Sequence, residues 1–423
     1  MRTRPAVSQA FQYGLIIFTL TVLLGLANAA QLFGALDRNT LLTHLHSGTL
    51  GWITMGVIGI AIWMFAREGE DLFAPVMLSA LSTAAYVMAF WSGVFILRGV
   101  FGLAELAVIV YWWWFVYTRI RAQGGIARLE ISKLCVLFGL TILVIGSTLG
   151  VIVQVLLATA VALPTNADLV GGHASAQIGG YLVLVAAGFA EWQLTGSAKR
   201  TTLGLAQAYL LFGGGLLLSV SVLLAPVLGP QLAQALPGVA TLLTVVGIVI
   251  VLVRVGRAAL AAPWMATTGT RHIAIAVAFL VLGVILQAVL VQQLIAAQGD
   301  FTLVSAGLVH AYDHAMFVGL MTNAIFGAIL VTSSGSGIAI SKNPVPPRVW
   351  PWADNVIFWG LNVGAAAFIA VLLILGSGEG KPAFTHPVSF VAPIMGLSAL
   401  LGIATYLMRL MGRPASVSSR ARA

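Results

Sequence analysis

Histidine is the residue type in this 423-residue chain whose spacing points most directly to chemistry. Five of its seven histidines fall in three short segments of similar pattern. When positions 44, 173 and 312 are aligned, glycine follows seven and fifteen residues later in all three segments, and tryptophan nineteen residues later in two. Clustered neutral imidazoles most often ligate a metal ion or a haem iron. The five candidate ligands are His44, His46, His173, His310 and His314.

The spacing within the segments says how many sites these histidines can serve. His44 and His46 are two residues apart, about 200° around a helix, and therefore address different sites. His310 and His314 are four residues apart and lie on one face. One helix can thus serve two centres. The alternative is that each histidine only makes a hydrogen bond between packed helices.

Composition places these segments in a membrane. The chain is 60% hydrophobic and only 8% charged, and its mean hydropathy is +1.03. These values exclude a soluble domain. The single cysteine, Cys135, excludes intrachain disulfides. Apolar stretches long enough to cross a bilayer recur throughout. The sequence predicts an all-α integral membrane protein of about twelve transmembrane helices, at 11–33, 41–66, 73–97, 99–118, 132–163, 172–195, 202–228, 236–256, 272–297, 302–333, 350–376 and 385–411.

The basic residues predict the orientation. With the N-terminus in the cytoplasm, 18 of the 21 lysines and arginines fall on the inner side. Only Arg38, Arg98 and Lys381 fall on the outer side, as the positive-inside rule requires. We therefore predict that both termini are cytoplasmic, and we attribute the net charge of +9 to topology and not to nucleic acid. Residues 1–30 also have the pattern of a signal peptide. We expect this segment to be retained, because the first repeat unit needs it.

The aligned segments lie on the second, sixth and tenth predicted helices. This period predicts one polytopic membrane domain, residues 1–423, built from three pseudo-repeats of four helices at about 11–121, 131–257 and 271–412. All three helices enter from the outer face, so all five histidines lie in the outer half of the membrane. Ionisable residues at such depth are functional candidates by default. His272 and His386 stand at helix ends and are interpreted as interface residues.

The run His44-Leu-His46-Ser-Gly-Thr-Leu-Gly51-Trp52 resembles the HxHSGxLGW signature of the catalytic subunit of haem–copper oxidases, in the cbb3-type oxidase and nitric oxide reductase branch. Twelve helices in three groups of four are also that family's architecture. In the family this signature belongs to helix 10, whereas here it stands on helix 2. The NnrS-like haem and copper proteins are a cousin, although their His-x-His-Glu-Met pattern is absent.

The resemblance implies a haem b held between helices 2 and 10, for which the aligned His46 and His314 are the expected axial ligands. Glu105, in the outer part of the fourth predicted helix, is expected to orient an imidazole N–H by a hydrogen bond; the alternative is that Glu105 pairs with Arg98. The remaining candidates, His44, His173 and His310, are left for copper, for a second haem or for no bound group. The seventh predicted helix has no histidine, so we do not expect a standard copper-B site.

The resemblance also implies a role in electron transport or in the chemistry of a diatomic gas, O2 or NO. The protein would then be an oxidoreductase of the cytochrome oxidase or nitric oxide reductase type. Its expected partners are the lipid bilayer and a cytochrome or other redox protein at the outer face, and its expected location is a bacterial plasma membrane. The alternative function is a polytopic transporter or permease in which the histidines are structural.

Overall fold

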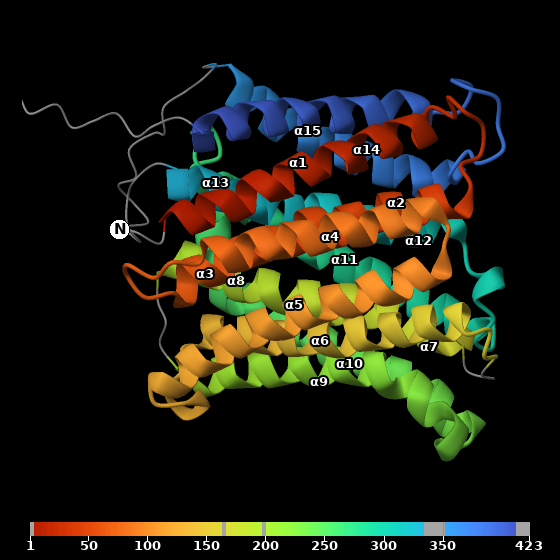
Figure 1. Cartoon of the computed structure of the whole chain (residues 1–423), viewed down its shortest axis with the longest axis horizontal. Helices are drawn as coiled ribbons and strands as arrows, with labels where there is room; N and C mark the ends of the chain where they lie inside the picture. Colours follow the sequence, from red (N-terminus) through yellow and green to blue (C-terminus); the bar gives the residue numbers. More distant parts are fainter. Residues whose placement is uncertain (1–3, 163–165, 197–199, 334–349, 351, 412–423) are drawn as a thin grey trace, which may run out of the picture.

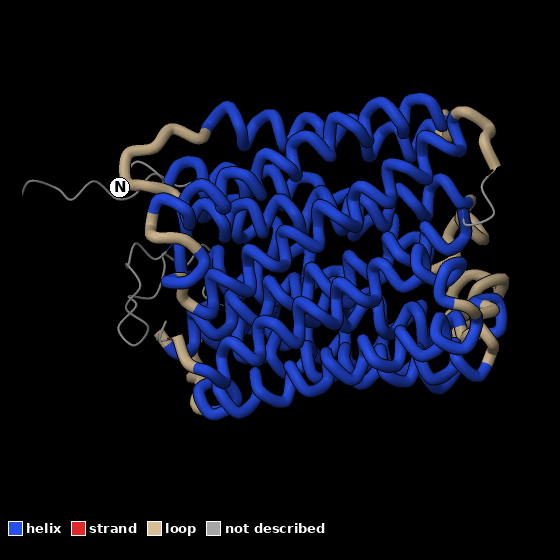
Figure 2. Tube along the Cα trace, turned by 90° about the horizontal axis from the view of Figure 1, so that it is seen from below, coloured by secondary structure: helices blue, strands red, loops and turns tan. Residues whose placement is uncertain are grey.

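The computed structural model describes residues 4–162, 166–196, 200–333, 350 and 352–411. Within these ranges the chain is all-helical, and twelve helical spans are long and apolar enough to cross a membrane. The spans run side by side along the horizontal axis of Figure 1, and Figure 2 shows the same bundle after a quarter turn. The prediction of an all-α, multi-pass membrane protein is confirmed.

Nine spans are single α-helices, and three are α-helices interrupted by a π-helical segment. Two 3-10 turns, Ile126–Arg128 (η2) and Phe301–Leu303 (η4), lie in loops. The spans are α1 (Arg4–Ala29); α2 (Arg38–His46), η1 (Ser47–Thr54) and α3 (Met55–Phe65); α4 (Phe73–Ser92); α5 (Phe95–Ala122); α6 (Ile131–Ala158); α7 (Asn166–Ser175), η3 (Ala176–Leu182) and α8 (Val183–Thr195); α9 (Thr202–Leu228); α10 (Pro230–Leu260); α11 (Gly269–Ala296); α12 (Ala306–His314), η5 (Ala315–Thr322) and α13 (Asn323–Ser333); α14 (Ala353–Leu375); and α15 (Val388–Met411).

The three interrupted spans are the ones that bear the candidate histidines. The π segments η1, η3 and η5 begin at residues 47, 176 and 315, each three residues after an aligned position, 44, 173 or 312. π-Helical turns are rare and occur frequently at functional sites. Each widened turn follows directly on the helix that carries the histidines, so it sets how that helix is presented to its neighbours. The division of the chain into three units remains a prediction.

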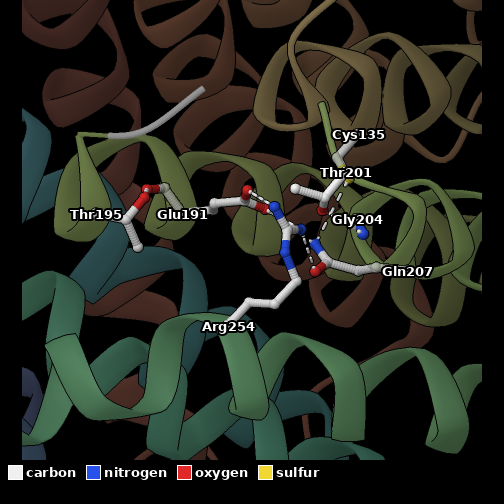
Figure 3. Close-up of polar contacts among 7 residues, drawn as sticks. All are labelled: Cys135, Glu191, Thr195, Thr201, Gly204, Gln207 and Arg254. Atoms are coloured by element: carbon white, nitrogen blue, oxygen red, sulfur yellow. Dashed lines mark hydrogen bonds and ion pairs between the residues drawn. The ribbon is translucent and has the colours of Figure 1, made fainter. Parts of the chain in front are cut away.

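Ion pairs join the helices at the end of the bundle where the N-terminus lies. In Figure 3, Arg254 of α10 reaches Glu191 at the end of α8, and its Nη1 also donates to Gln207 Oε1 of α9 at 2.7 Å. Gln207 Nε2 donates to Glu191 Oε2 at 3.2 Å. Glu191 thus accepts hydrogen bonds from two residues, Arg254 and Gln207, while it is almost fully buried, at 2% side-chain exposure. This arrangement satisfies the carboxylate and joins three helices.

A second pair of this kind lies between α14 and α15. Arg409 Nη2 contacts Asp354 Oδ2 at 2.7 Å, and the two side chains are 2% and 0% exposed. Another pair, between Arg119 of α5 and Glu70 of the loop between α3 and α4, is more exposed, at 19% and 20%. Because water screens the Arg119 pair and not the Arg409 pair, removal of one partner has different consequences in the two places.

His272 is not an interface residue, contrary to the sequence-based interpretation. It is fully buried on α11, where its Nδ1 lies 2.9 Å from Asn323 Oδ1 of α13. The interpretation depended on the position of His272 near a helix end, but the chain is packed around the ring here; the amide of Asn323 partners Nδ1, while Nε2 is buried without a hydrogen-bond partner in the described residues. His386 lies in the loop before α15 and is half-buried.

The buried ion pair gives a stability prediction. Arg409→Met leaves the Asp354 carboxylate buried without its counter-charge, and we expect the free energy of unfolding to fall by about 3 kcal/mol. Arg119→Met removes the half-exposed counterpart, for which we expect a loss of about 1 kcal/mol or less. Denaturant titration in detergent, followed by tryptophan fluorescence, measures both. Equal losses in the two variants would contradict the role assigned to burial.

Candidate functional site

The larger of the two cavities that contain candidate histidines lies among α1, α2, η1, α12, η5, α14 and α15. It has a volume of about 340 Å³. Three of the candidate histidines line it, His44 from α2 and His310 and His314 from α12. Most of the other lining side chains are apolar, among them Phe18, Val22, Leu26, Trp52, Phe317, Phe368, Leu372 and Met395. A largely apolar cavity with a few convergent polar groups is the usual form of a cofactor site.

Two of these histidines are held by backbone carbonyls. His44 Nδ1 lies 2.9 Å from the carbonyl oxygen of Thr21 on α1, and His314 Nδ1 lies 2.7 Å from that of His310. A carbonyl oxygen can only accept, so Nδ1 carries the proton in both neutral rings and Nε2 carries a free lone pair. Metal-ligating histidines are oriented in this way.

His310 and Asp313 also lie in the polar part of this cavity. The His310 carbonyl accepts from His314, while the His310 ring itself faces the cavity. Asp313 lines the same cavity, and within the described ranges no hydrogen bond to its carboxylate is found. The four-residue spacing of His310 and His314 places both on one face, in agreement with the sequence-based expectation. His314 also packs against Phe368, with the ring centroids 4.6 Å apart.

The second cavity lies on the other side of α2 and has a volume of about 90 Å³. It contains His46 from α2, His173 from α7 and Glu105 from α5. His46 Nδ1 is 2.7 Å from the Leu42 carbonyl oxygen, and His173 Nδ1 is 2.7 Å from the Gly146 carbonyl oxygen. In this pair too, Nδ1 is the protonated nitrogen and Nε2 keeps its lone pair.

Two glycines allow the helices to come close to these imidazoles. A Cβ added to Gly25 would lie 2.9 Å from Cε1 of His44, and one added to Gly150 would lie 2.8 Å from Cε1 of His173. Such distances are too short for a real contact, so any larger residue would push the ring away. The absence of a side chain is therefore needed for the hydrogen bonds to Thr21 and Gly146.

The structure therefore brings the candidate ligands together in two groups that differ from the predicted pairing. His46 and His314, the pair expected from the resemblance, line different cavities. His44 shares its cavity with His314, and His46 shares its cavity with His173. The separation of His44 from His46 follows from their two-residue spacing. No group of three or more metal-ligating side chains occurs in the part of the chain that the structure describes.

Glu105 is bound by hydroxyl groups and not by arginine. Its Oε2 accepts from Ser82 at 2.5 Å and its Oε1 from Thr83 at 2.9 Å, both on α4. Arg98 instead donates to Asn39 Oδ1 at 2.7 Å and to the Phe90 carbonyl oxygen at 3.0 Å. Because backbone carbonyls occupy the imidazole Nδ1 atoms, the role of Glu105 as a partner of a histidine remains a prediction.

The π segments contact one another through side chains that the sequence did not single out. Trp52 Nε1 of η1 donates to Thr322 Oγ1 of η5 at 2.9 Å, and Tyr181 Oη of η3 donates to Thr54 Oγ1 of η1 at 3.4 Å. Thr54 and Thr322 each donate in turn to the carbonyl oxygen five residues earlier. Thr54 and Thr322 each lie ten residues after an aligned position, 44 or 312, and this shared spacing was the sequence signal that could have revealed them.

The bond from Trp52 gives a prediction about how η1 is held against η5. Thr322→Val keeps the shape of the side chain but leaves the buried indole N–H without an acceptor, and we expect a loss of about 1–3 kcal/mol in the free energy of unfolding. Thr332→Val is the control, because Thr332 donates only to its own helix. Thermal unfolding in detergent compares the two. The account fails if Thr322→Val is as stable as wild type.

Comparison with known proteins gives a likeness of fold. No protein-family model and no curated protein sequence matches this chain. A chain in a cryo-EM structure of a heme-copper terminal oxidase dimer superimposes with a TM-score of 0.71 and 11% identity, over 98% of this chain and 85% of the other. At this identity the likeness shows the fold alone. The protein is a multi-pass membrane protein with the fold of a heme-copper terminal oxidase chain.

Proposed function

We propose that this protein is a membrane-embedded b-type cytochrome, and that its larger cavity binds a haem between His44 and His314. The observation that carries the proposal is the pair of imidazoles from α2 and α12 that line one cavity, each with Nδ1 bonded to a carbonyl and Nε2 free. The oxidase-like fold supports it independently.

The cavity fits the group. Its volume of about 340 Å³ lies in the range of roughly 300–1,000 Å³ usual for ligand sites. Aromatic and aliphatic side chains cover most of its wall, as a porphyrin requires. Polar lining residues that can receive the carboxylate substituents of a porphyrin are Asn28, Gln31 and Ser377.

The ligand set determines what such a site does. A haem iron held by two neutral imidazoles transfers electrons and has no open position for a gas. Backbone carbonyls of the chain hold the two ligand rings in fixed orientations. The Thr21 carbonyl fixes the His44 ring, and the His310 carbonyl fixes the His314 ring. Both bonds favour the same tautomer whatever the oxidation state. We therefore infer electron transfer as the function, in preference to gas binding at this position.

Two finer features follow from the same reading. Without a copper ligand on α9, we propose that the protein has no standard copper-B site. Electrons have to enter from a separate redox protein at the outer face, because the loops on that side are short. A bacterial plasma membrane is the setting that we propose for this exchange.

Removal of either axial ligand gives a spectroscopic test of the pairing. We expect wild type to show a b-type α-band in the reduced-minus-oxidised spectrum. His44→Ala and His314→Ala each lose the part of the band due to this haem and gain carbon monoxide binding, because each opens one axial position. The double variant loses no more of the band than either single one, since both ligands hold one iron.

Two matched controls remove a histidine that is not a proposed ligand. His310→Ala removes one inside the cavity, and His386→Ala removes one outside it. Both are expected to keep the wild-type band. A wild-type protein without a porphyrin spectrum, expressed with ample haem supply, would contradict the proposal. Loss of the band in His310→Ala with retention in His314→Ala would show that His310, and not His314, is the ligand from α12.

A further inference from the structure

The pair His46 and His173 occupies the same two aligned positions as the pair His314 and His44. In the aligned segments His44 and His173 share position 0, and His46 and His314 share position +2. The larger cavity joins position +2 of the third segment to position 0 of the first, and the smaller cavity joins position +2 of the first segment to position 0 of the second. A repeat arranged as a ring produces equivalent interfaces in this way.

The surroundings of the rings are repeated as well. The two +2 histidines, His46 and His314, each donate from Nδ1 to the carbonyl four residues earlier. Each also packs on a phenylalanine of the following span, His46 on Phe90 at 3.8 Å between ring centroids and His314 on Phe368 at 4.6 Å.

The two position-0 histidines match in the same detail. His44 and His173 each bond through Nδ1 to a carbonyl of the preceding span, that of Thr21 or Gly146. A glycine four residues after each of those carbonyls, Gly25 or Gly150, lies against the ring. Five features that orient the imidazoles of the first site therefore recur at the second: spacing, tautomer, carbonyl, aromatic contact and glycine.

From this equivalence we propose that the smaller cavity is a second haem site, with His46 and His173 as axial ligands. The inference deepens the proposed function and rests on it. At about 90 Å³ this cavity is the smaller of the two, so a porphyrin would have to displace aliphatic side chains of the lining, which include Leu106 and Ile178. The third equivalent place has Ser175 and Tyr312 in place of histidines, and the Tyr312 hydroxyl donates to Gln287 Oε1 at 3.3 Å. It has no imidazole ligand.

The two sites adjoin each other. Leu45 and Phe317 line both cavities, so single side chains form the wall between them. His44 and His46 come from the same short helix and place the two centres on its opposite sides. An electron delivered to either haem would therefore have a short path to the other, and both centres lie in the same half of the bundle.

The test counts haems and assigns them by pairs of substitutions. We expect two haems per wild-type chain by the pyridine haemochrome assay, and an α-band of half the wild-type amplitude in His46→Ala, His173→Ala and the double variant of these two. The cross-site double variant, His173→Ala with His314→Ala, loses the whole band. Ser175→Ala is the matched control at the aligned position without a histidine and keeps both haems.

A rescue experiment covers the case in which a variant folds poorly. His173→Gly leaves room for free imidazole, and we expect added imidazole to restore the missing half of the band. One haem per wild-type chain, unaffected by His173→Ala, overturns the second site and leaves the first intact. Copper that is lost in His173→Ala, measured by mass spectrometry alongside a single haem, also overturns it. If the band depends on His46 and His173 but not on His44 and His314, the proposed function fails instead.

Discussion

The hydrogen bond from an imidazole Nδ1–H to a backbone carbonyl is the interaction on which the account of this protein depends. It occurs at four of the five histidines that face the two cavities. Inside a membrane an imidazole without a partner is costly, and this bond satisfies one nitrogen while it leaves the other free. The donor set, the tautomer and the ring orientation all follow from it. The helix packing around the sites serves to keep these carbonyls in place.

The π segments make this arrangement possible. Each is a widened stretch directly after a histidine-bearing helix, and η1 contacts both η3 and η5 through hydroxyl and aromatic side chains. The three spans therefore contact one another through their π segments, while their histidines line the two cavities between these spans and their neighbours. Ion pairs such as Arg254–Glu191 stabilise the opposite end, away from the cavities.

Much of the fold could be predicted from composition, because apolar length and charge asymmetry are strong signals. The candidate histidines were found for the same reason, since polar residues are conspicuous in apolar helices. The pairing of His46 with His314 came from treating equivalent positions as partners. The structure places these two residues in different cavities, because the helices that carry them pack against different neighbours there. The π turns were also beyond prediction, since one extra residue in a turn leaves the apolar pattern of a buried helix unchanged. His272 was misjudged because its buried partner, Asn323, is distant in sequence.

The most direct test of the central claim is a cryo-EM map of the protein purified in detergent without added ligand. The account predicts planar density in the larger cavity, continuous with Nε2 of both His44 and His314. Lipid-like or featureless density there, with the two rings turned away from each other, would contradict the claim that these two histidines clamp one iron.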